Sequence, residues 1–341
     1  MKILVTGATG FLGEYLVALL AKRYEKVFIL SRKAKLESDS KFSQHTNVFP
    51  VTGDITHFDV INSKDERKNE ILDEVEIVIH AAALYDLEAS YSDCFLHNVV
   101  GTQNILHVLK NMKNLKAFFA ISTIAVGDPN SYFLDEDVLP QRSHFTDSYS
   151  ATKYQAEKLI RENVSSKFIT RIIRPGIIIG DTNGNAMPKL DGPYYFIRSI
   201  KEHLSLLSKI PIIPLSYNSK TKMPIIPVDH CARLIELLIH RAGESHFSGP
   251  TLKTYHLISH ELPTIKMFLD DLCNHFGLKT TFIPLKQNIA HDYILKHLGI
   301  PKEVLPFMFS KLSYDKSNTL EDLPEITEST YGQYKSILFG K

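Results

Sequence analysis

A glycine-rich turn stands near the start of the chain, at the junction of an expected strand and an expected helix. The apolar run Ile3–Val5 leads into Thr6–Gly13, and apolar residues then recur at helical spacing through Phe11–Lys22. At such a junction, backbone amides and the helix dipole attract the pyrophosphate of a dinucleotide. The glycines suit a tight turn, close approach of the backbone to phosphate, and close packing of the helix on the strand. The residues expected to contact the dinucleotide in this turn are Gly7, Thr9, Gly10, Phe11, Leu12 and Gly13.

Short apolar runs alternate with helix-length segments through the first half of the chain. The expected strands are Ile3–Val5, Val27–Leu30, Val48–Val51, Ile77–Ile79, Ala117–Ile121 and Ile169–Ile173. Three of the expected helices are Phe11–Lys22, Ser90–Met112 and Ser148–Asn163. Strands separated by helices in this order form a parallel sheet with right-handed crossovers. We therefore expect an α/β fold built on a doubly wound parallel sheet.

The composition of the chain changes after Gly180. Residues 181–227 are rich in Pro, Gly, Asn and Lys and contain a short helical stretch around Tyr194–Leu207, and helical spacing resumes over Val228–Arg241. Prolines then separate short helical stretches in the rest of the chain. We expect residues 1–180, completed by about 228–250, to form the dinucleotide-binding domain. Residues 181–227 and 251–341 are expected to form a smaller carboxyl-terminal cap that binds the substrate.

Charge and cysteine content exclude several other classes of protein. The net charge of +1, from 39 basic and 38 acidic residues, provides no broad basic field for nucleic acid. The three cysteines are too few and too widely spaced for a disulfide framework or a zinc site, so no metal is expected. The first residues lack the apolar core of a signal peptide, and no run reaches the roughly 18 apolar residues of a membrane-spanning helix. We therefore expect a cytoplasmic protein without a transmembrane segment.

The end of the second expected strand bears on the choice of dinucleotide. An acidic residue at this place would bind the adenosine ribose of NAD, but the chain has Ser31, Arg32 and Lys33 there. A hydroxyl and two cations suit the 2′-phosphate of NADP, because a guanidinium binds phosphate through paired hydrogen bonds. The alternative is a solvated basic loop, so NADP is preferred and NAD remains open. After the third strand, Asp54 has two open roles, a contact with the adenine amino group or a helix cap.

Tyr149 and Lys153 lie four residues apart on an expected helix. They share one helix face, with roughly 5–6 Å between their Cβ atoms. An ammonium beside a phenol favours the phenolate, which prepares the phenol to exchange a proton near working pH. Thr123 ends the fifth expected strand, at the sheet edge where ligands of open parallel sheets bind. Its hydroxyl can bond a substrate oxygen beside Tyr149, with Ser122 as the alternate.

Taken together, these motifs resemble the extended short-chain dehydrogenase/reductases along nearly the whole chain. The matching segments are Thr6–Gly13, Asp54–Ile55, His80–Ala83, Asn98–Thr102, Ser122–Thr123, Tyr149–Lys153 and Arg174–Gly176. The resemblance implies a Rossmann fold and an NAD(P)-dependent oxidoreductase with Thr123, Tyr149, Lys153 and Asn98 in its active site. It also implies that Lys153 binds the nicotinamide ribose and that Asp229 ties the returning helix to the sheet. The further cofactor-binding residues that it implies are Asp54, Ile55, Ala81, Ala82, Ala83, Pro175 and Gly176.

Within that family, the segments around Asn98, Ser122 and Arg174 are most similar to thioester reductases and fatty acyl-CoA reductases. This branch implies an apolar acyl thioester, aldehyde or ketone as substrate, with a thioester delivered on coenzyme A or a carrier protein. Family members often pair through the helices expected at Ser90–Met112 and Ser148–Asn163, which makes a homodimer plausible.

Two alternative functions stay open, a nucleotide-sugar epimerase or dehydratase with tightly bound cofactor and a dinucleotide-binding scaffold without catalysis. Apolar residues of the cap either line an acyl groove or form the core of the cap. They are Met187, Tyr194, Tyr195, Phe196, Ile210, Ile212 and Ile213.

Overall fold

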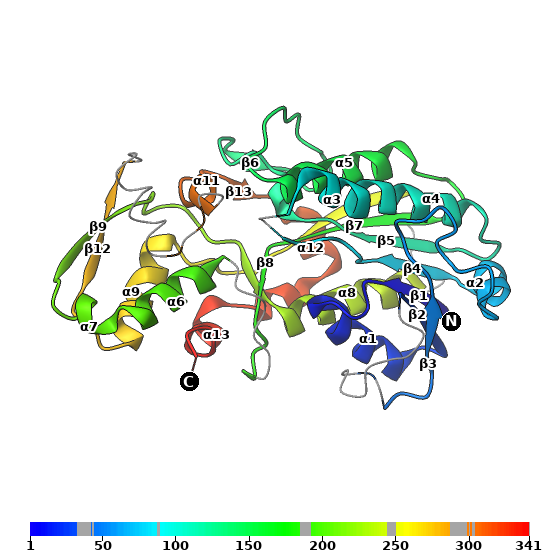
Figure 1. Ribbon diagram of the computed structural model, residues 1–341, viewed down its shortest axis with the longest axis horizontal. Helices are drawn as coiled ribbons and strands as arrows, with labels where there is room; N and C mark the ends of the chain where they lie inside the picture. Colours follow the sequence, from blue (N-terminus) through cyan, green and yellow to red (C-terminus); the bar gives the residue numbers. More distant parts are fainter. Residues whose placement is uncertain are drawn as a thin grey trace.

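A computed structural model describes residues 1–32, 42, 44–86, 89–184, 192–243, 250–286, 299, 301 and 304–340. Its centre is a seven-stranded sheet in the order β11-β7-β5-β4-β1-β2-β3, and every neighbouring pair is parallel (Figure 1). The strands are β1 (Lys2–Thr6), β2 (Lys26–Ser31), β3 (Val48–Thr52), β4 (Ile77–His80), β5 (Ala117–Ile121), β7 (Ile169–Pro175) and β11 (Leu252–Leu257). The expected doubly wound parallel sheet is confirmed.

Helices cover both faces of this sheet, as Figure 1 shows. One face carries α1 (Phe11–Arg23) and α8 (Val228–Gly243), which pack on each other through buried side chains such as Leu16, Leu20 and Ile235. The other face carries α5 (Ser148–Glu162) and a long helical stretch made of α3 (Tyr91–Cys94), a π-helix η1 (Phe95–Val100) and α4 (Gly101–Lys110). The short helix α2 (Lys68–Glu74) precedes β4. None of the described helices is long and apolar enough to cross a membrane.

The cap forms a separate apolar core beside the sheet. It contains α6 (Pro193–Glu202), α7 (Leu204–Leu207), α9 (Ile265–His275), α11 (Leu305–Met308) and α13 (Tyr331–Leu338), with the paired strands β9 (Ile212–Ser216) and β12 (Thr281–Leu285). Two small parallel pairs connect it to the rest, β8 (Ile177–Ile179) with β10 (Ile225–Pro227) and β6 (Phe133–Leu134) with β13 (Ser313–Tyr314). Tyr194 and Phe196 are buried in the cap core, whereas Ile212 is 56% exposed. Met187 lies outside the described residues.

One strand lies in a different part of the fold from the one expected for its residues. β11 falls in the range expected for the cap, but it pairs with β7 as the edge strand of the central sheet. The following α12 (Ser317–Asp322) and η4 (Pro324–Glu328) return to the same domain, because Leu323 and Ile326 are buried in the core under α1 and α8. This strand could not be recognised in the sequence, because Lys253 and His256 interrupt its apolar residues. Both side chains are nevertheless buried.

Candidate active site

The glycine-rich turn is closed by backbone contacts that no larger residue would allow. Gly7 has φ +74°, and a Cβ atom built on it would lie 2.5 Å from the amide nitrogen of Ala82. A Cβ on Gly13 would lie 2.1 Å from the carbonyl oxygen of Gly7. Gly10 is exposed and starts α1 without a capping side chain. The first amides of α1 are therefore left for a ligand, and this arrangement fits a dinucleotide pyrophosphate.

The remaining residues expected in the turn lie around this helix start. Thr9 is exposed, and Phe11 and Leu12 are half-buried in the first turn of α1. The ring of Phe11 meets the ring of Tyr15 edge-on at 6.1 Å between centroids. The Tyr15 hydroxyl donates to Asp181 Oδ2 at 2.6 Å. The amino end of α1 is thereby tied to the chain that follows β8.

A polar chain links the ends of β1 and β4 to the long helical stretch. The amide of Ala82 donates to Thr6 Oγ1 at 3.2 Å, and Thr6 Oγ1 lies 2.8 Å from His80 Nδ1. Thr102 Oγ1 donates to the Asn98 carbonyl at 2.6 Å, so it accepts from His80 Nε2 at 3.1 Å. Burial, together with the nearby Lys153 cation, lowers the pKa of His80 to about 3. His80 is therefore neutral, with its proton on Nε2, and it fixes the strand end from which Ala81, Ala82 and Ala83 continue.

The residues after β2 and β3 lie close to each other. Ser31 ends β2, Arg32 is exposed beside it, and Lys33 lies outside the described residues. Burial raises the pKa of the Asp54 carboxyl, but hydrogen bonds from Thr56 and the charges of His57 and Arg32 bring the pKa below its ordinary value. Asp54 Oδ1 accepts from both the amide and the hydroxyl of Thr56 at 2.9 Å, so this carboxylate closes a local turn.

Ile55 follows in this turn and is buried, and its carbonyl accepts from Asn104 Nδ2 at 2.8 Å. A Cβ built on Gly101 would lie 2.8 Å from Ile55 Cδ1, so α4 packs directly against this residue. The turn after β3 is thereby held at the sheet edge where the other expected cofactor residues lie.

Asn98 sits in the π-helix η1 and bridges two segments. Its Oδ1 accepts from the Leu84 amide at 2.7 Å, while its Nδ2 donates to the Leu84 carbonyl at 3.2 Å and to Thr152 Oγ1 at 3.0 Å. The side chain is buried. Asn98 therefore fixes the loop after β4 against α5 at the position next to Lys153.

Helix α5 carries Tyr149 and Lys153 at the carboxyl edge of the sheet. Asp147 caps the helix by accepting from the Ser150 amide at 2.6 Å. Lys153 Nζ donates to the carbonyl of Ile121, the last residue of β5, at 2.5 Å. Burial lowers the pKa of Lys153 to about 8, although Glu157 acts in the opposite direction. This contact joins α5 to the strand end that leads directly to Thr123.

Thr123 and Tyr149 lie in the segments joined by this contact. Thr123 is buried and caps a short 3-10 helix, η2 (Ile124–Val126), by accepting from the Ala125 amide at 3.2 Å. Tyr149 is half-buried, and its ring meets that of Tyr85 edge-on at 4.6 Å between centroids and an interplanar angle of 85°. Tyr85 comes from the loop that Asn98 holds, and no motif in the sequence pointed to it.

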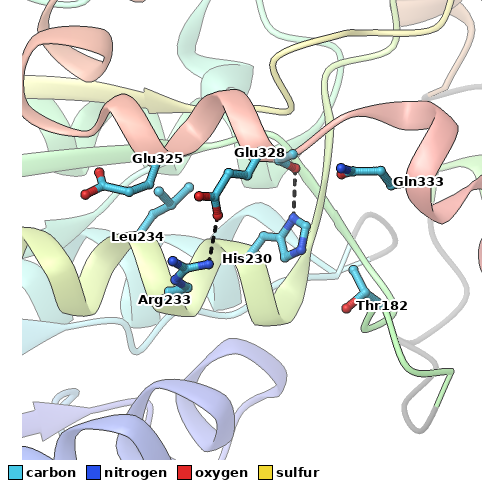
Figure 2. Close-up of a pocket in the computed structure, with 8 residues that line it drawn as sticks. Thr182, His230, Arg233, Leu234, Glu325, Glu328 and Gln333 are labelled. Atoms are coloured by element: carbon cyan, nitrogen blue, oxygen red, sulfur yellow. Dashed lines mark hydrogen bonds and ion pairs between the residues drawn. The ribbon is translucent and has the colours of Figure 1, made fainter.

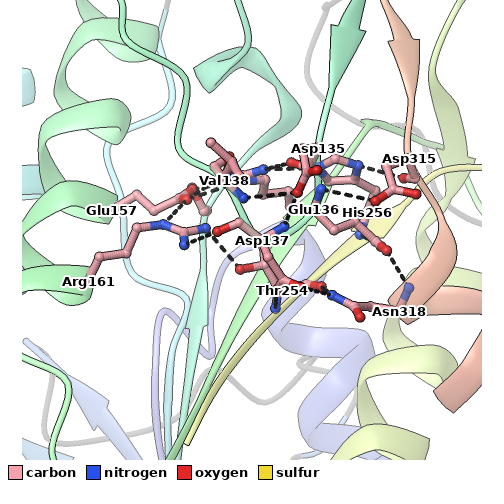
Figure 3. A network of polar contacts seen from close by, with 12 residues as sticks. Asp135, Glu136, Asp137, Val138, Glu157, Arg161, Thr254, His256, Asp315 and Asn318 are labelled. Atoms are coloured by element: carbon pink, nitrogen blue, oxygen red, sulfur yellow. Dashed lines mark hydrogen bonds and ion pairs between the residues drawn. The ribbon is translucent and has the colours of Figure 1, made fainter. Parts of the chain in front are cut away.

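Glu157, one turn beyond Lys153, anchors a buried ionic network (Figure 3). Its Oε2 accepts from Ser122 Oγ at 2.6 Å, and its Oε1 accepts from Arg174 at 2.6 Å and from Arg161 at 2.9 Å. Burial raises the pKa of the Glu157 carboxyl, but the two arginines outweigh burial and bring the pKa to about 2. Arg174 also donates to His256 Nε2 at 3.0 Å. The network therefore joins α5, β7 and β11 next to the candidate active site.

The segment after β7 is packed as closely as the glycine-rich turn. Pro175 ends β7, and the Gly176 amide donates to the Leu257 carbonyl at 2.9 Å. A Cβ on Gly176 would lie 2.1 Å from the Pro224 carbonyl oxygen, so only glycine fits between these backbones. Further along, Asp229 at the start of α8 accepts from the Thr182 amide at 3.2 Å and from its hydroxyl at 2.5 Å. This contact matches the structural role expected for Asp229.

Two hollows lie in the surface of the part of the chain that the structure describes. One, of about 450 Å³, lies between α8 and the segment running from η4 into α13, with Thr182 at its side (Figure 2). Its charges are largely satisfied from within, because Arg233 pairs with Glu328 at 3.0 Å and His230 Nδ1 lies 3.0 Å from Ser329 Oγ. The other, of about 510 Å³, is lined by residues that include Lys222, Ile258 and Lys316.

Comparisons with known proteins show which family and which fold the chain is similar to. The model of a family described as Male sterility protein matches residues 5–235. The chain is 27% identical to L-2-aminoadipate reductase of Saccharomyces cerevisiae over 69% of its length and 18% of that protein. It is 23% identical to a fatty acyl-CoA reductase of Drosophila melanogaster over 79% of its length and 60% of that protein. The chain thus spans less than two thirds of either relative.

Among solved structures, the terminal R domain from the myxalamid PKS-NRPS biosynthetic pathway has the same fold. It matches with a TM-score of 0.77 at 22% identity, covering 99% of this chain and 89% of that domain.

Proposed function

We propose a carbonyl-reducing function for this chain, which belongs to the Male sterility protein family within the extended short-chain dehydrogenase/reductases, a class of NAD(P)-dependent oxidoreductases. The proposed reaction is NADPH-dependent reduction of the carbonyl of an apolar acyl thioester, aldehyde or ketone, or its reverse. The observation that carries it is the contact of Lys153 Nζ with the Ile121 carbonyl at 2.5 Å. This contact sets Lys153, Tyr149 and Thr123 at one edge of the sheet.

The chain's own residues would hold the cofactor along this edge. The uncapped start of α1 suits the pyrophosphate, and Arg32 beside Ser31 suits a 2′-phosphate. Pro175 and Gly176 would lie beside the nicotinamide and Lys153 beside its ribose. When bound, NADPH supplies the hydride.

Tyr149 is the proposed proton donor to the carbonyl oxygen. The Thr123 hydroxyl would hold that oxygen beside the phenol, and the positive charge of Lys153 stabilises the phenolate left after donation. Asn98 keeps α5 and the loop carrying Tyr85 in register, and the edge-on ring of Tyr85 covers one side of Tyr149. Asn98 and Tyr85 therefore act as positioning residues in this proposal.

The test is oxidation of NADPH, followed by absorbance, with acyl thioesters, aldehydes, ketones and nucleotide sugars. We expect stoichiometric oxidation with a thioester, an aldehyde or a ketone. A nucleotide sugar converted without net change in NADPH would replace this proposal with an epimerase or dehydratase. Failure of every substrate with cofactor-loaded protein would favour a scaffold without catalysis.

A further inference from the structure

Arg142 lies in the long loop that separates Thr123 from Tyr149 along the chain. The loop runs from Gly127 to Asp147, between η2 and α5, and the structure describes all of it (Figure 1). Its one strand, β6, has two residues. A loop of about 20 residues with so little regular structure has many conformations open to it unless side chains fix it. Because the first turn of α5 carries Tyr149, contacts across this loop bear on where the Tyr149 phenol lies.

The guanidinium of Arg142 binds both ends of this loop. Its Nη1 donates to the carbonyl of Ala125 at 2.7 Å and to the carbonyl of Gly127 at 2.8 Å. These carbonyls lie at the end of η2, the 3-10 helix that Thr123 caps, and carbonyls at a helix end lack partners within the helix. The Nε of Arg142 donates to the His144 carbonyl at 3.0 Å. One side chain therefore ties the segment that carries Thr123 to the segment that leads into α5.

Ring contacts extend this tie from Arg142 to α5 itself. The guanidinium lies over the Phe145 ring, 4.3 Å from its centroid, and the Phe145 ring meets the Tyr154 ring at 5.2 Å between centroids. Tyr154 lies in α5, next to Lys153. A cation over an aromatic face is favourable, and stacking holds the guanidinium plane in one orientation. Phe145 therefore connects the guanidinium to the helix that carries Tyr149.

The charge of Arg142 is not used in an ion pair. Among the described residues, no carboxylate oxygen lies within the 4.0 Å of an ion pair with its guanidinium. Burial lowers the pKa of Arg142, and the more distant charges of Asp128 and Asp147 act in the opposite direction. Asp128 closes a turn after η2 by accepting from the Asn130 amide at 2.9 Å, and Asp147 caps α5. The hydrogen bonds of Arg142 go to backbone carbonyls instead, so they fix the course of the chain rather than neutralise an acid.

We propose that Arg142 is a positioning residue that sets the Thr123 hydroxyl and the Tyr149 phenol on the same substrate oxygen. This inference rests on the proposed function, in which both groups contact that oxygen. A displacement of about 1 Å at a reacting group lowers the rate on the order of 10²-fold. Arg142 itself contacts neither substrate nor cofactor in this proposal. Its loss should therefore lower kcat and leave the KM for NADPH unchanged.

The kinetic test compares Arg142→Met with wild type on a carbonyl substrate found in the NADPH screen. Methionine keeps an unbranched side chain without the donors, so kcat should fall about 10- to 100-fold while the KM for NADPH stays within about twofold. Arg67→Met is the matched control. The Arg67 guanidinium also stands over a phenylalanine ring, that of Phe49 at 5.8 Å, but Arg67 lies at the start of α2. Its kcat should equal that of wild type.

A double-mutant cycle with Tyr149→Phe separates positioning from a general loss of structure. If Arg142 acts by placing the phenol, Arg142→Met should lower kcat by less than about threefold once the hydroxyl is gone. An equal loss of kcat in both backgrounds would overturn the proposal, because the two residues would then act independently. Phe145→Leu is the second variant should Arg142→Met fail to fold. It removes the ring under the guanidinium, so kcat should fall about three- to tenfold, and a wild-type kcat would overturn the proposal.

Fluorine NMR of the chain labelled with 3-fluorotyrosine gives a readout that needs no substrate. Of the 15 tyrosine signals, the one lost in Tyr149→Phe belongs to this residue. Its shift is sensitive to small displacements, because the Tyr85 ring meets the Tyr149 ring edge-on at 4.6 Å. Arg142→Met should shift or broaden this signal, and Arg67→Met should not.

The NMR signal and kcat together separate this inference from the proposed function. A displaced Tyr149 signal in a protein that reduces no carbonyl would support Arg142 as the residue that places Tyr149 and would overturn the proposed function. An unmoved signal together with a wild-type kcat in Arg142→Met would overturn this inference and keep the function.

Discussion

Replacing Lys153 with Met should abolish turnover and yet leave the cofactor-free protein at least as stable as wild type near pH 7. Lys153 is buried, and its pKa falls from 10.5 to about 8. At about 1.4 kcal/mol per pKa unit, the folded state holds the charged form at a cost of about 3 kcal/mol. Methionine removes this cost but leaves the Ile121 carbonyl without its donor, which costs about 1–3 kcal/mol. The net gain at pH 7 is therefore about 0–2 kcal/mol.

The pH dependence of this difference identifies its cause. Between pH 8 and 10.5 the unfolded wild-type chain still binds the proton that the folded chain has released, so the free energy of unfolding of wild type rises with pH relative to the variant. By pH 10.5 wild type should have recovered about 3 kcal/mol against Lys153→Met. Urea unfolding followed by circular dichroism at pH 7, 8.5 and 10 measures the difference. Lys158→Met, at a 61% exposed position of the same helix, should change stability by less than about 0.5 kcal/mol at every pH. A difference between wild type and Lys153→Met that stays constant over this pH range would refute the reasoning.

The other predictions concern single residues of the site. Tyr149→Phe should keep NADPH binding, measured by fluorescence titration, but lower turnover about 10²–10⁴-fold because the proton donor is lost; turnover within a few-fold of wild type would require another acid. Arg32→Ala should weaken NADP binding by about 1.5–3 kcal/mol and NAD binding very little, and calorimetry showing equal losses would contradict the 2′-phosphate assignment. Gly7→Ala should lower the free energy of unfolding by about 2–4 kcal/mol, since φ is +74° and the new methyl would lie 2.5 Å from the Ala82 amide. Gly10→Ala, whose Cβ meets only the Gly7 carbonyl at 3.2 Å, should cost less in the same urea titration.

The strands and covering helices could be predicted from the sequence because each has its own local periodicity. β1 and β5 are short apolar runs, and α1 has apolar residues at helical spacing, so these elements need no distant information. β11 could not be found in this way. Its Lys253 and His256 look like solvent-facing residues, and distant partners, among them Glu321 and Arg174, make their burial favourable.

The same distinction applies to the candidate site. The spacing of Tyr149 and Lys153 in the chain places them on one helix face. Glu157 lies on the same helix and resembles an ordinary exposed acid in the sequence, but its partners are distant: Ser122 directly follows β5, and Arg174 lies in β7.

The π-helix around Asn98 makes the active site depend on the length of one helical stretch. An α-helix turns by about 100° per residue, and a π turn accommodates one residue more than an α turn between the same two ends. Deleting one residue from Phe95–Val100 would let the stretch from Tyr91 to Lys110 continue as a regular α-helix. Because the π turn fits its extra residue between the same two ends, the two flanks would keep their orientation, and the side chains inside the turn would move to new positions around the helix axis. Asn98 could no longer face Leu84 and Thr152 while α4 keeps its buried face on the sheet. A single-codon deletion here would thus alter the candidate active site without removing Thr123, Tyr149 or Lys153, and relatives with a regular helix at this place would need a different means of positioning the proposed proton donor.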